Sequence, residues 1–319
     1  MSKFIKYLDV KTKIFMNRLL VIGGTGFIGY HLSQKAKSKG WKVTSVSLGI
    51  PKIKRRIKGV KYIKLDITKK NQIKKKLLDN FTYVVNLGGH TSNINKKKYQ
   101  KKIYDSHLKG STNLMNFFVK KNIQSFVQVG SSAEYGLTSS PQKENDKCKP
   151  ANIYGIAKLR ATNYLLKLTK SKNFKGNVLR FFQVYGPRQG QTRVVPQILY
   201  SCYKNKMFPT SDGKQIRDFC YIDDATKSIF KILNKKRVYG QIFNIGYGKG
   251  ISIKSLINEI QKITKSGTPV YGMLKERNYE NLKLVPDIKK AKKILNWKPT
   301  ISLKSGLLKT LKYIKKYER

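Results

Sequence analysis

The sequence has few acidic residues, few cysteines and no long apolar run, and each shortage limits what the protein can be. Only 16 of its 319 residues are Asp or Glu, against 68 Lys or Arg, which gives a formal charge of +52. Cys148, Cys202 and Cys220 stand apart without CxxC spacing, and the three histidines are scattered, so we expect no disulfide framework and no metal site. Isolated thiols favour a reducing, cytoplasmic compartment. No apolar run approaches the length that crosses a bilayer, so membrane insertion is not expected.

The large positive charge is compatible with nucleic acid or an anionic membrane as a partner. The basic residues are spread along the whole chain, however, and most are Lys rather than Arg. Arg is the better phosphate ligand, because its guanidinium group can form two parallel hydrogen bonds with phosphate. Residues with AT-rich codons, such as Ile, Asn and Tyr, are abundant, whereas Ala is scarce. We therefore attribute most of the charge to genome composition and expect no nucleic-acid partner. A polyanion-binding protein stays open as an alternative from another functional class.

The most informative segment is residues 17–29, which read NRLLVIGGTGFIG. A short apolar run precedes Gly23, Gly26 and Gly29, and a helical pattern begins after them. Between a strand and a helix, this spacing predicts a dinucleotide site. The first glycine permits the tight turn, the second lets the backbone approach a pyrophosphate, and the third lets the helix pack on the strand. The amides of Phe27 and Ile28 would then point at the phosphates.

Strand and helix signals alternate after this turn, which predicts an α/β fold. The expected strands are 42–48, 61–65, 83–87, 125–129 and 177–182, and the expected helices include 72–78, 111–121 and 154–170. Such alternation predicts a Rossmann-type, doubly wound parallel sheet with its ligand at the carboxyl ends of the strands. The pattern loosens after residue 186. We expect an N-terminal extension (1–16), a dinucleotide-binding domain (17–187 plus 218–247) and a smaller, mostly helical substrate lobe (188–217 plus 248–319).

Two segments inside this pattern carry chemistry. Ser131 and Ser132 follow an expected strand in VQVGSSAEYG, and Tyr154 and Lys158 in YGIAK share one helix face. A phenol has an ordinary pKa of about 10 and is a poor base at neutral pH. A nearby ammonium group favours the phenolate and lowers that pKa.

The chain resembles the extended short-chain dehydrogenase/reductase family, and within it the nucleotide-sugar epimerases, dehydratases and reductases. The resemblance covers about residues 17–312. It rests on an ordered set of motifs, which are GGTGFIG, GSSAEYG, YGIAK, LRFFQVYGPRQ, QIRDFCYIDDA, FNIGYG and ILNWKPT.

The resemblance implies roles for the residues that match these motifs. Tyr154 would be the catalytic acid/base, Lys158 would hold the nicotinamide ribose and lower the pKa of Tyr154, and Ser131 would bond the same sugar oxygen. The cofactor groove would include Asp66, Ile67, Leu87, Gly88 and Gly89 beside the glycine turn. The substrate would be held by Ser132, Gln183, Arg217 and Arg277, with the two arginines on its diphosphate.

Four positions depart from the family pattern. The second strand ends at Ser47 without the acidic residue that usually binds the adenosine ribose, and basic residues follow, so NAD and NADP both stay open. Ser132 and the alanine after it replace the Asp-Glu pair of the 4,6-dehydratases, so dehydration is not expected. Glu134 should point to the other side of the strand end. Gln183 and His107 each replace an Asn, and His107 is interpreted as a core histidine bonded to backbone.

With dehydration set aside, we expect a reaction at C4 of a nucleotide-linked hexose. The product would serve the synthesis of surface-polysaccharide sugars. A 4-epimerase would oxidise C4, rotate the keto sugar and reduce its other face with tightly held NAD. The alternative is an NADPH-dependent reductase of a 4-keto-6-deoxysugar, which performs only the reduction step of that reaction. The resemblance also implies a homodimer formed through the helices expected at 111–121 and 154–170. Neither the sugar nor its nucleotide follows from the sequence.

Overall fold

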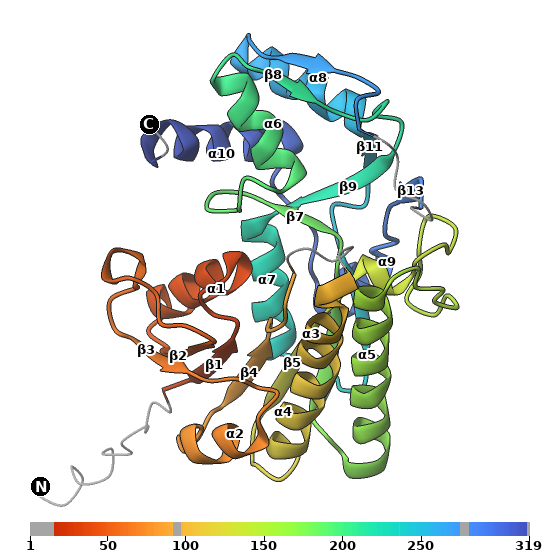
Figure 1. Cartoon of the computed structure of the whole chain (residues 1–319). Coiled ribbons are helices and arrows are strands. Elements are labelled where there is room, and N and C mark those ends of the chain that lie inside the picture. Colours follow the sequence, from red (N-terminus) through yellow and green to blue (C-terminus); the bar gives the residue numbers. More distant parts are fainter. Residues whose placement is uncertain (1–15, 92–96, 236, 275–280, 318–319) are drawn as a thin grey trace, which may run out of the picture.

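Figure 1 shows the computed structural model of the chain, which describes residues 16–91, 97–235, 237–274 and 281–317. Residues 1–15, which make up most of the expected N-terminal extension, lie outside these ranges, and so does the expected substrate residue Arg277. Among the described residues, no helix combines the length and the apolar character needed to cross a membrane.

A seven-stranded sheet in which every pairing is parallel forms the centre of the molecule. Its strands lie in the order β10-β6-β5-β4-β1-β2-β3, so the direction of winding reverses between β1 and β4. This is the doubly wound arrangement predicted from the sequence, and it places a crevice at the carboxyl ends of these two strands. The strands are β1 (Arg18–Ile22), β2 (Lys42–Ser47), β3 (Val60–Lys64), β4 (Tyr83–Asn86), β5 (Ser125–Ser131), β6 (Gly176–Phe181) and β10 (Ile242–Ile245).

Alternate residues of β1 supply the cores on the two faces of the sheet. Leu19 and Val21 belong to one buried cluster, and Leu20 and Ile22 belong to the other. Because both faces are covered, the strand is a continuous apolar run rather than an alternating one. One face is covered by α1 (Phe27–Ser38) and α7 (Ile222–Leu233), and the other by α2 (Lys70–Lys76), α4 (Gly110–Phe118) and α5 (Ile153–Lys172) (Figure 1).

A smaller lobe packs at the carboxyl end of the sheet (Figure 1). The segments expected to be mostly helical also contain strands, because β9 pairs with β7, β11 and β13, and β8 pairs with β12. Strand β9 runs directly into α7 and so joins the lobe to the main sheet. The other strands and α-helices after residue 182 are β7 (Gln183–Tyr185), α6 (Val194–Tyr203), β8 (Met207–Pro209), β9 (Ile216–Tyr221), β11 (Gly250–Ser252), α8 (Ile253–Thr264), β12 (Thr268–Val270), β13 (Lys283–Leu284), α9 (Lys289–Leu295) and α10 (Leu303–Tyr317). Helix α3 (Gln100–Tyr104) lies between β4 and α4 in the chain.

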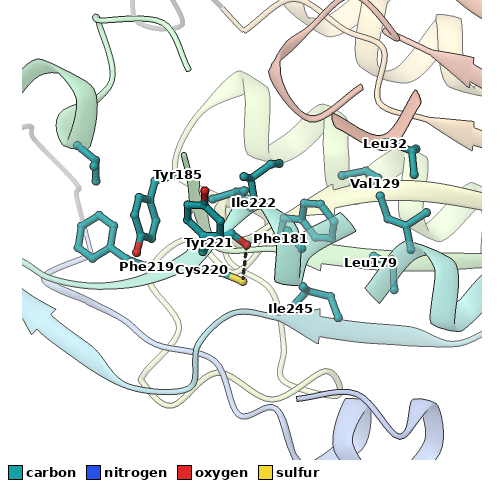
Figure 2. Close-up of a cluster of buried hydrophobic side chains, with 14 of the residues drawn as sticks. Leu32, Val129, Leu179, Phe181, Tyr185, Phe219, Cys220, Tyr221, Ile222 and Ile245 are labelled. Atoms are coloured by element: carbon teal, nitrogen blue, oxygen red, sulfur yellow. Dashed lines mark hydrogen bonds between the residues drawn. The ribbon is translucent and has the colours of Figure 1, made fainter. Parts of the chain in front are cut away.

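A single buried cluster connects the sheet with the lobe (Figure 2). Val129 of β5 and Leu179 of β6 lie at one end of this cluster, and Tyr185 of β7 and Phe219 of β9 lie at the other. All four side chains are buried. Continuous packing of this kind fixes the lobe over the strand ends, where the crevice opens.

Candidate active site

A cleft of about 1390 Å³ runs along the carboxyl ends of the strands and under the lobe. Its lining contains the predicted catalytic and cofactor residues together, and two of the predicted substrate residues. They are Gly23, Gly26, Phe27, Ile28, Gly29, Asp66, Ile67, Leu87, Gly88, Gly89, Ser131, Ser132, Tyr154, Lys158 and Gln183. Residues far apart in the sequence therefore meet where the strand order reverses.

The glycine turn forms a cradle made of backbone. Gly23 has a φ of 75° and donates its amide to Val46 O at 2.7 Å. A Cβ atom on Gly29 would collide with Gly23 O, so the helix could not lie this close to the turn with any other residue. Gly26 caps α1 without a side-chain hydrogen bond, and the first turn of the helix holds no acidic residue. Amides at such a helix start suit a pyrophosphate, so this end of the cleft fits a dinucleotide.

At the end of the cleft where the sequence predicts the adenosine, the side chains of Ser47 and Asp66 form hydrogen bonds within the protein. The Ser47 hydroxyl donates to Val46 O at 2.7 Å and accepts from Thr25 Oγ1 at 2.8 Å. The carboxylate of Asp66 accepts from the amide and the hydroxyl of Thr68 at 2.9 and 2.8 Å. Asp66 is the single acidic residue among the described lining residues, whereas the basic lining residues include Lys52 and Arg55.

The residues predicted to be catalytic come from the end of β5 and the first turns of α5. Asn152 caps the start of helix α5, and its Oδ1 accepts from Gly155 N at 2.9 Å. A Cβ atom on Gly155 would collide with Ala133 O, so the glycine lets α5 pack closely on the segment after β5. This packing places Tyr154 beside Ser131 in the lining of the cleft, where the Ser131 side chain lowers the pKa of the phenol. One turn further along, Lys158 Nζ donates to Val129 O at 2.7 Å and lies 5.9 Å from the centre of the Tyr154 ring.

The pKa of Tyr154 differs from the expectation. Burial raises this pKa and the charge of Glu134 adds to the rise, while the Ser131 side chain and the charge of Arg193 oppose it. The expected lowering by Lys158 was wrong for the structure as it stands, because the desolvation of the phenol outweighs the favourable contacts. Burial also lowers the pKa of Lys158 to about 8, against the charge of Glu134.

His107 is a core histidine bonded to backbone, as the sequence predicted. It lies in a π-helical turn, η3 (Asp105–Lys109), and its Nε2 is 3.0 Å from His90 O. Burial lowers its pKa well below the ordinary value, so the ring is neutral. Its ring also meets the Tyr154 ring edge-on, with centres 4.9 Å apart, which the sequence did not reveal. Turns of this type are frequent at functional sites.

The lobe contributes charged residues that differ from the expected ones. Arg217 is buried in β9, where its Nη1 donates to Ile216 O and Leu282 O at 2.8 and 3.2 Å, and it is not among the described lining residues. Arg193, which the sequence analysis missed, lines the cleft and donates to Thr91 O at 3.4 Å. Its only sequence signal is an uncommon Arg before a helix.

The strand order, the glycine turn at the point of reversal and the cleft above it define a Rossmann-type α/β protein. The NAD dependent epimerase/dehydratase family matches residues 19–246. The chain belongs to this family.

Relatives match the chain along almost its whole length. A putative UDP-glucose 4-epimerase of Methanocaldococcus jannaschii is 30% identical over 312 residues, covering 94% of this chain and 99% of that protein. A crystal structure of UDP-glucose 4-epimerase with UDP-glucose, from Thermotoga maritima, superposes with a TM-score of 0.88 at 28% identity, covering 95% of this chain and all of that one.

A Bacillus cereus UDP-glucuronic acid 4-epimerase in complex with UDP-glucuronic acid and NAD has a TM-score of 0.84 at 26% identity, covering 94% of this chain and 99% of that one. Nucleotide-sugar decarboxylases and a 4,6-dehydratase also match the chain, at 24 to 26% identity. The chain is thus a nucleotide-sugar enzyme of the epimerase/dehydratase type.

Proposed function

We propose that the chain is an NAD-dependent 4-epimerase of a UDP-linked hexose or hexuronate, and that it serves surface-polysaccharide synthesis. The observation that carries the proposal is the contact of Ser131 with Tyr154, beside Lys158, in the cleft that also holds the glycine turn. The 4-epimerases among the similar proteins support the same choice, since their names specify UDP-glucose or UDP-glucuronate.

In this proposal, Tyr154 is the acid/base. Its Oη takes the proton of the C4 hydroxyl as C4 is oxidised and returns a proton when the opposite face of the keto sugar is reduced, so Tyr154 is regenerated. Ser131 binds the same oxygen, and Lys158 holds the ribose of the cofactor and supplies positive charge near the phenol. The bound NAD supplies hydride transfer. The cleft holds the sugar nucleotide between the glycine turn and the lobe, with Ser132, Gln183, Arg217 and Arg277 as proposed contacts.

The residues beside Ser131 do not suit a 4,6-dehydratase, which eliminates water from the sugar. Ser132 lines the cleft beside Ser131 and carries no carboxylate. Glu134 does point to the other side of the strand end, as expected, because it is fully buried against Arg180. Dehydration needs an acid and a base at the sugar, and neither position supplies them.

A specific observation favours a second candidate, the NADPH-dependent 4-keto reductase. The end of β2 carries Ser47 in place of an acidic residue, and Lys52 and Arg55 line the neighbouring part of the cleft. A basic environment of this kind accommodates a 2′-phosphate.

We also infer a homodimer. Helices α4 and α5 lie side by side on the outer face of the sheet (Figure 1), where Tyr164 Oη donates to Asn116 Oδ1 at 2.6 Å. Light scattering of the purified protein tests this inference, because a monomeric mass would contradict it.

The test is to denature the purified protein, identify the nucleotides released, and assay the intact protein with UDP-glucose and UDP-glucuronate. Stoichiometric NAD and a C4-epimeric product are expected. A protein that contains no nucleotide, binds NADPH and reduces a 4-keto sugar would support the reductase. If it bound neither nucleotide but bound RNA at physiological salt, the polyanion alternative would hold instead.

A further inference from the structure

A buried ion pair lies next to the end of β5, which carries Ser131. Glu134, at the end of the short helix η4 (Ser132–Glu134), accepts a hydrogen bond from Arg180 Nε on its Oε2 at 2.8 Å. Glu134 has no exposed surface and Arg180 has 2% exposed surface. Removing two charges from water is costly, and such a pair is weak evidence for stability on its own. Its position therefore calls for another explanation.

The Glu134 carboxylate is bonded on both oxygens to elements that carry catalytic residues. Its Oε1 accepts from the amide of Ser131 at 2.8 Å, while Ser131 Oγ accepts from Ala133 N at 3.2 Å. These two bonds form a capping box that fixes the chain where β5 ends. Its Oε2 also accepts from Thr162 Oγ1 of α5 at 2.9 Å. One carboxylate thus ties the Ser131 segment to the helix of Tyr154 and Lys158.

The neighbouring backbone leaves room for this carboxylate. Gly130 of β5 pairs in register with Arg180 of β6. A Cβ atom on Gly130 would lie 2.5 Å from Glu134 Oε1 and 3.1 Å from Arg180 Cγ. A side chain at position 130 would displace the Glu134 carboxylate, so the ion pair requires glycine at this position.

The charge of Glu134 also acts on Lys158. Thr162 follows Lys158 by one helical turn on the same face, so the carboxylate lies beneath that face of α5. The titratable groups that act on Lys158 or lie against it are Glu134 of η4, Tyr154 of α5 and His107 of η3. The histidine is neutral, and burial raises the pKa of the phenol, so Glu134 is the one anion among them. Its charge raises the pKa of Lys158 against the effect of burial.

We propose that Glu134 is a positioning residue, whose carboxylate fixes the Ser131 segment and whose charge keeps Lys158 in its ammonium form. The inference rests on the proposed function, because it assigns Glu134 to the support of that reaction. Glu134 acts through Ser131 and Lys158, and it does not touch the substrate.

The experiment compares Glu134→Gln with Thr162→Val in the full-length protein. The first variant keeps the shape of the side chain and removes its charge, whereas the second removes one hydrogen bond from the same carboxylate and leaves the charge. Lys158 is labelled with acetic anhydride over a pH series and quantified by peptide mass spectrometry. This readout needs no substrate, so it stays informative if the protein proves to have no epimerase activity.

In Glu134→Gln, the pH at which half of Lys158 is labelled should fall by about one pH unit. The alkaline limb of kcat/KM should move with it, while KM at pH 7 stays within about twofold. Thr162→Val should keep the wild-type midpoint. Equal midpoints in all three proteins would overturn the proposal and leave Glu134 a purely structural residue.

A second variant covers the case in which Glu134→Gln leaves Arg180 unpaired and fails to fold. Glu134→Gln combined with Arg180→Met replaces the pair by uncharged side chains, an exchange that buried ion pairs often tolerate. This double variant should fold and should show the same fall in the labelling midpoint, because Glu134 is the charged group that raises the pKa of Lys158. A wild-type midpoint in the double variant would contradict the proposal.

Discussion

The two ends of the cleft are built in different ways. The end that we propose for the cofactor, called the cofactor end, is made of backbone from one continuous turn, in which Gly23, Gly26 and Gly29 leave space for the chain itself and for a ligand. The end that we propose for the sugar, called the substrate end, is assembled from side chains of several segments, including Ser131, Gln183 and Arg193. A local backbone site depends on a few glycines. An assembled site depends on the packing that joins β5, β7 and β9 (Figure 2).

Under the proposed function, one end holds the cofactor that the family shares and the other end holds the substrate. A phosphate-binding turn is the same for any nicotinamide cofactor. Side chains on separate elements can change one at a time, and so the same fold supports epimerases, decarboxylases and a dehydratase among the similar proteins. Substitutions at the cofactor end should therefore weaken NAD binding, whereas substitutions at the substrate end should weaken binding of the sugar nucleotide.

The largest effect is expected where the two ends meet, at Tyr154. Tyr154→Phe removes the proton-carrying group and keeps the ring that packs edge-on against His107. Steady-state assays should show a fall in kcat of about 10²- to 10⁴-fold, with the amount of bound NAD unchanged. A variant with wild-type turnover would show that Tyr154 is not the acid/base.

At the cofactor end, Gly29→Ala should disrupt the turn itself. The added methyl group collides with Gly23 O, which is backbone and cannot rotate away. Overpacking of this kind costs about 1–3 kcal/mol, or roughly 5- to 150-fold in NAD affinity measured by calorimetry. The matched control is Gly190→Ala in the lobe, where the Cβ position is open, and its NAD affinity should equal that of the wild type. Normal NAD binding by Gly29→Ala would contradict the proposal that the glycine turn holds the cofactor.

At the substrate end, Arg217→Met should raise the KM for the UDP-sugar by about tenfold or more, because a charged hydrogen bond contributes about 1.5–3 kcal/mol. Bound NAD and kcat should change little, as for a loss of uniform binding. The alternative is a structural role, because the Arg217 side chain also donates to the carbonyl oxygens of Ile216 and Leu282. A lower melting temperature with unchanged KM would make Arg217 structural and remove it from the substrate site.

The smallest effect is a pH dependence from Lys158, whose pKa is lowered to about 8 by burial. The ammonium is the active form in this account, so kcat/KM should be constant below that pH and fall as the pH rises through it. The fall should be about twofold at pH 8 and about tenfold at pH 9. A profile that stays flat to pH 10 would show that Lys158 need not be charged.

The parts of the site that depend on local sequence could be predicted. The strands lie within two residues of their predicted positions, because buried parallel strands are apolar runs bounded by polar segments. The glycine turn was predicted from its spacing, and Ser131, Tyr154 and Lys158 from a family resemblance. All three residues line the same cleft.

The parts that depend on tertiary pairing could not be predicted. Glu134 meets Arg180 only because β6 lies beside β5 in a register that pairs Gly130 with Arg180. The edge contact of His107 on Tyr154 requires η3 to pack against α5. Neither contact leaves a sequence signal, because its partners are tens of residues apart in the chain.

The most direct test of the central claim uses UDP-glucose that carries deuterium at C4. A self-contained epimerase removes that hydride to its bound NAD and returns it to the other face of the same carbon. We predict that the C4-epimeric product, analysed by mass spectrometry and NMR, retains the deuterium at C4 without added cofactor. Loss of the label to solvent, or the absence of an epimeric product from both UDP-glucose and UDP-glucuronate, would contradict the account.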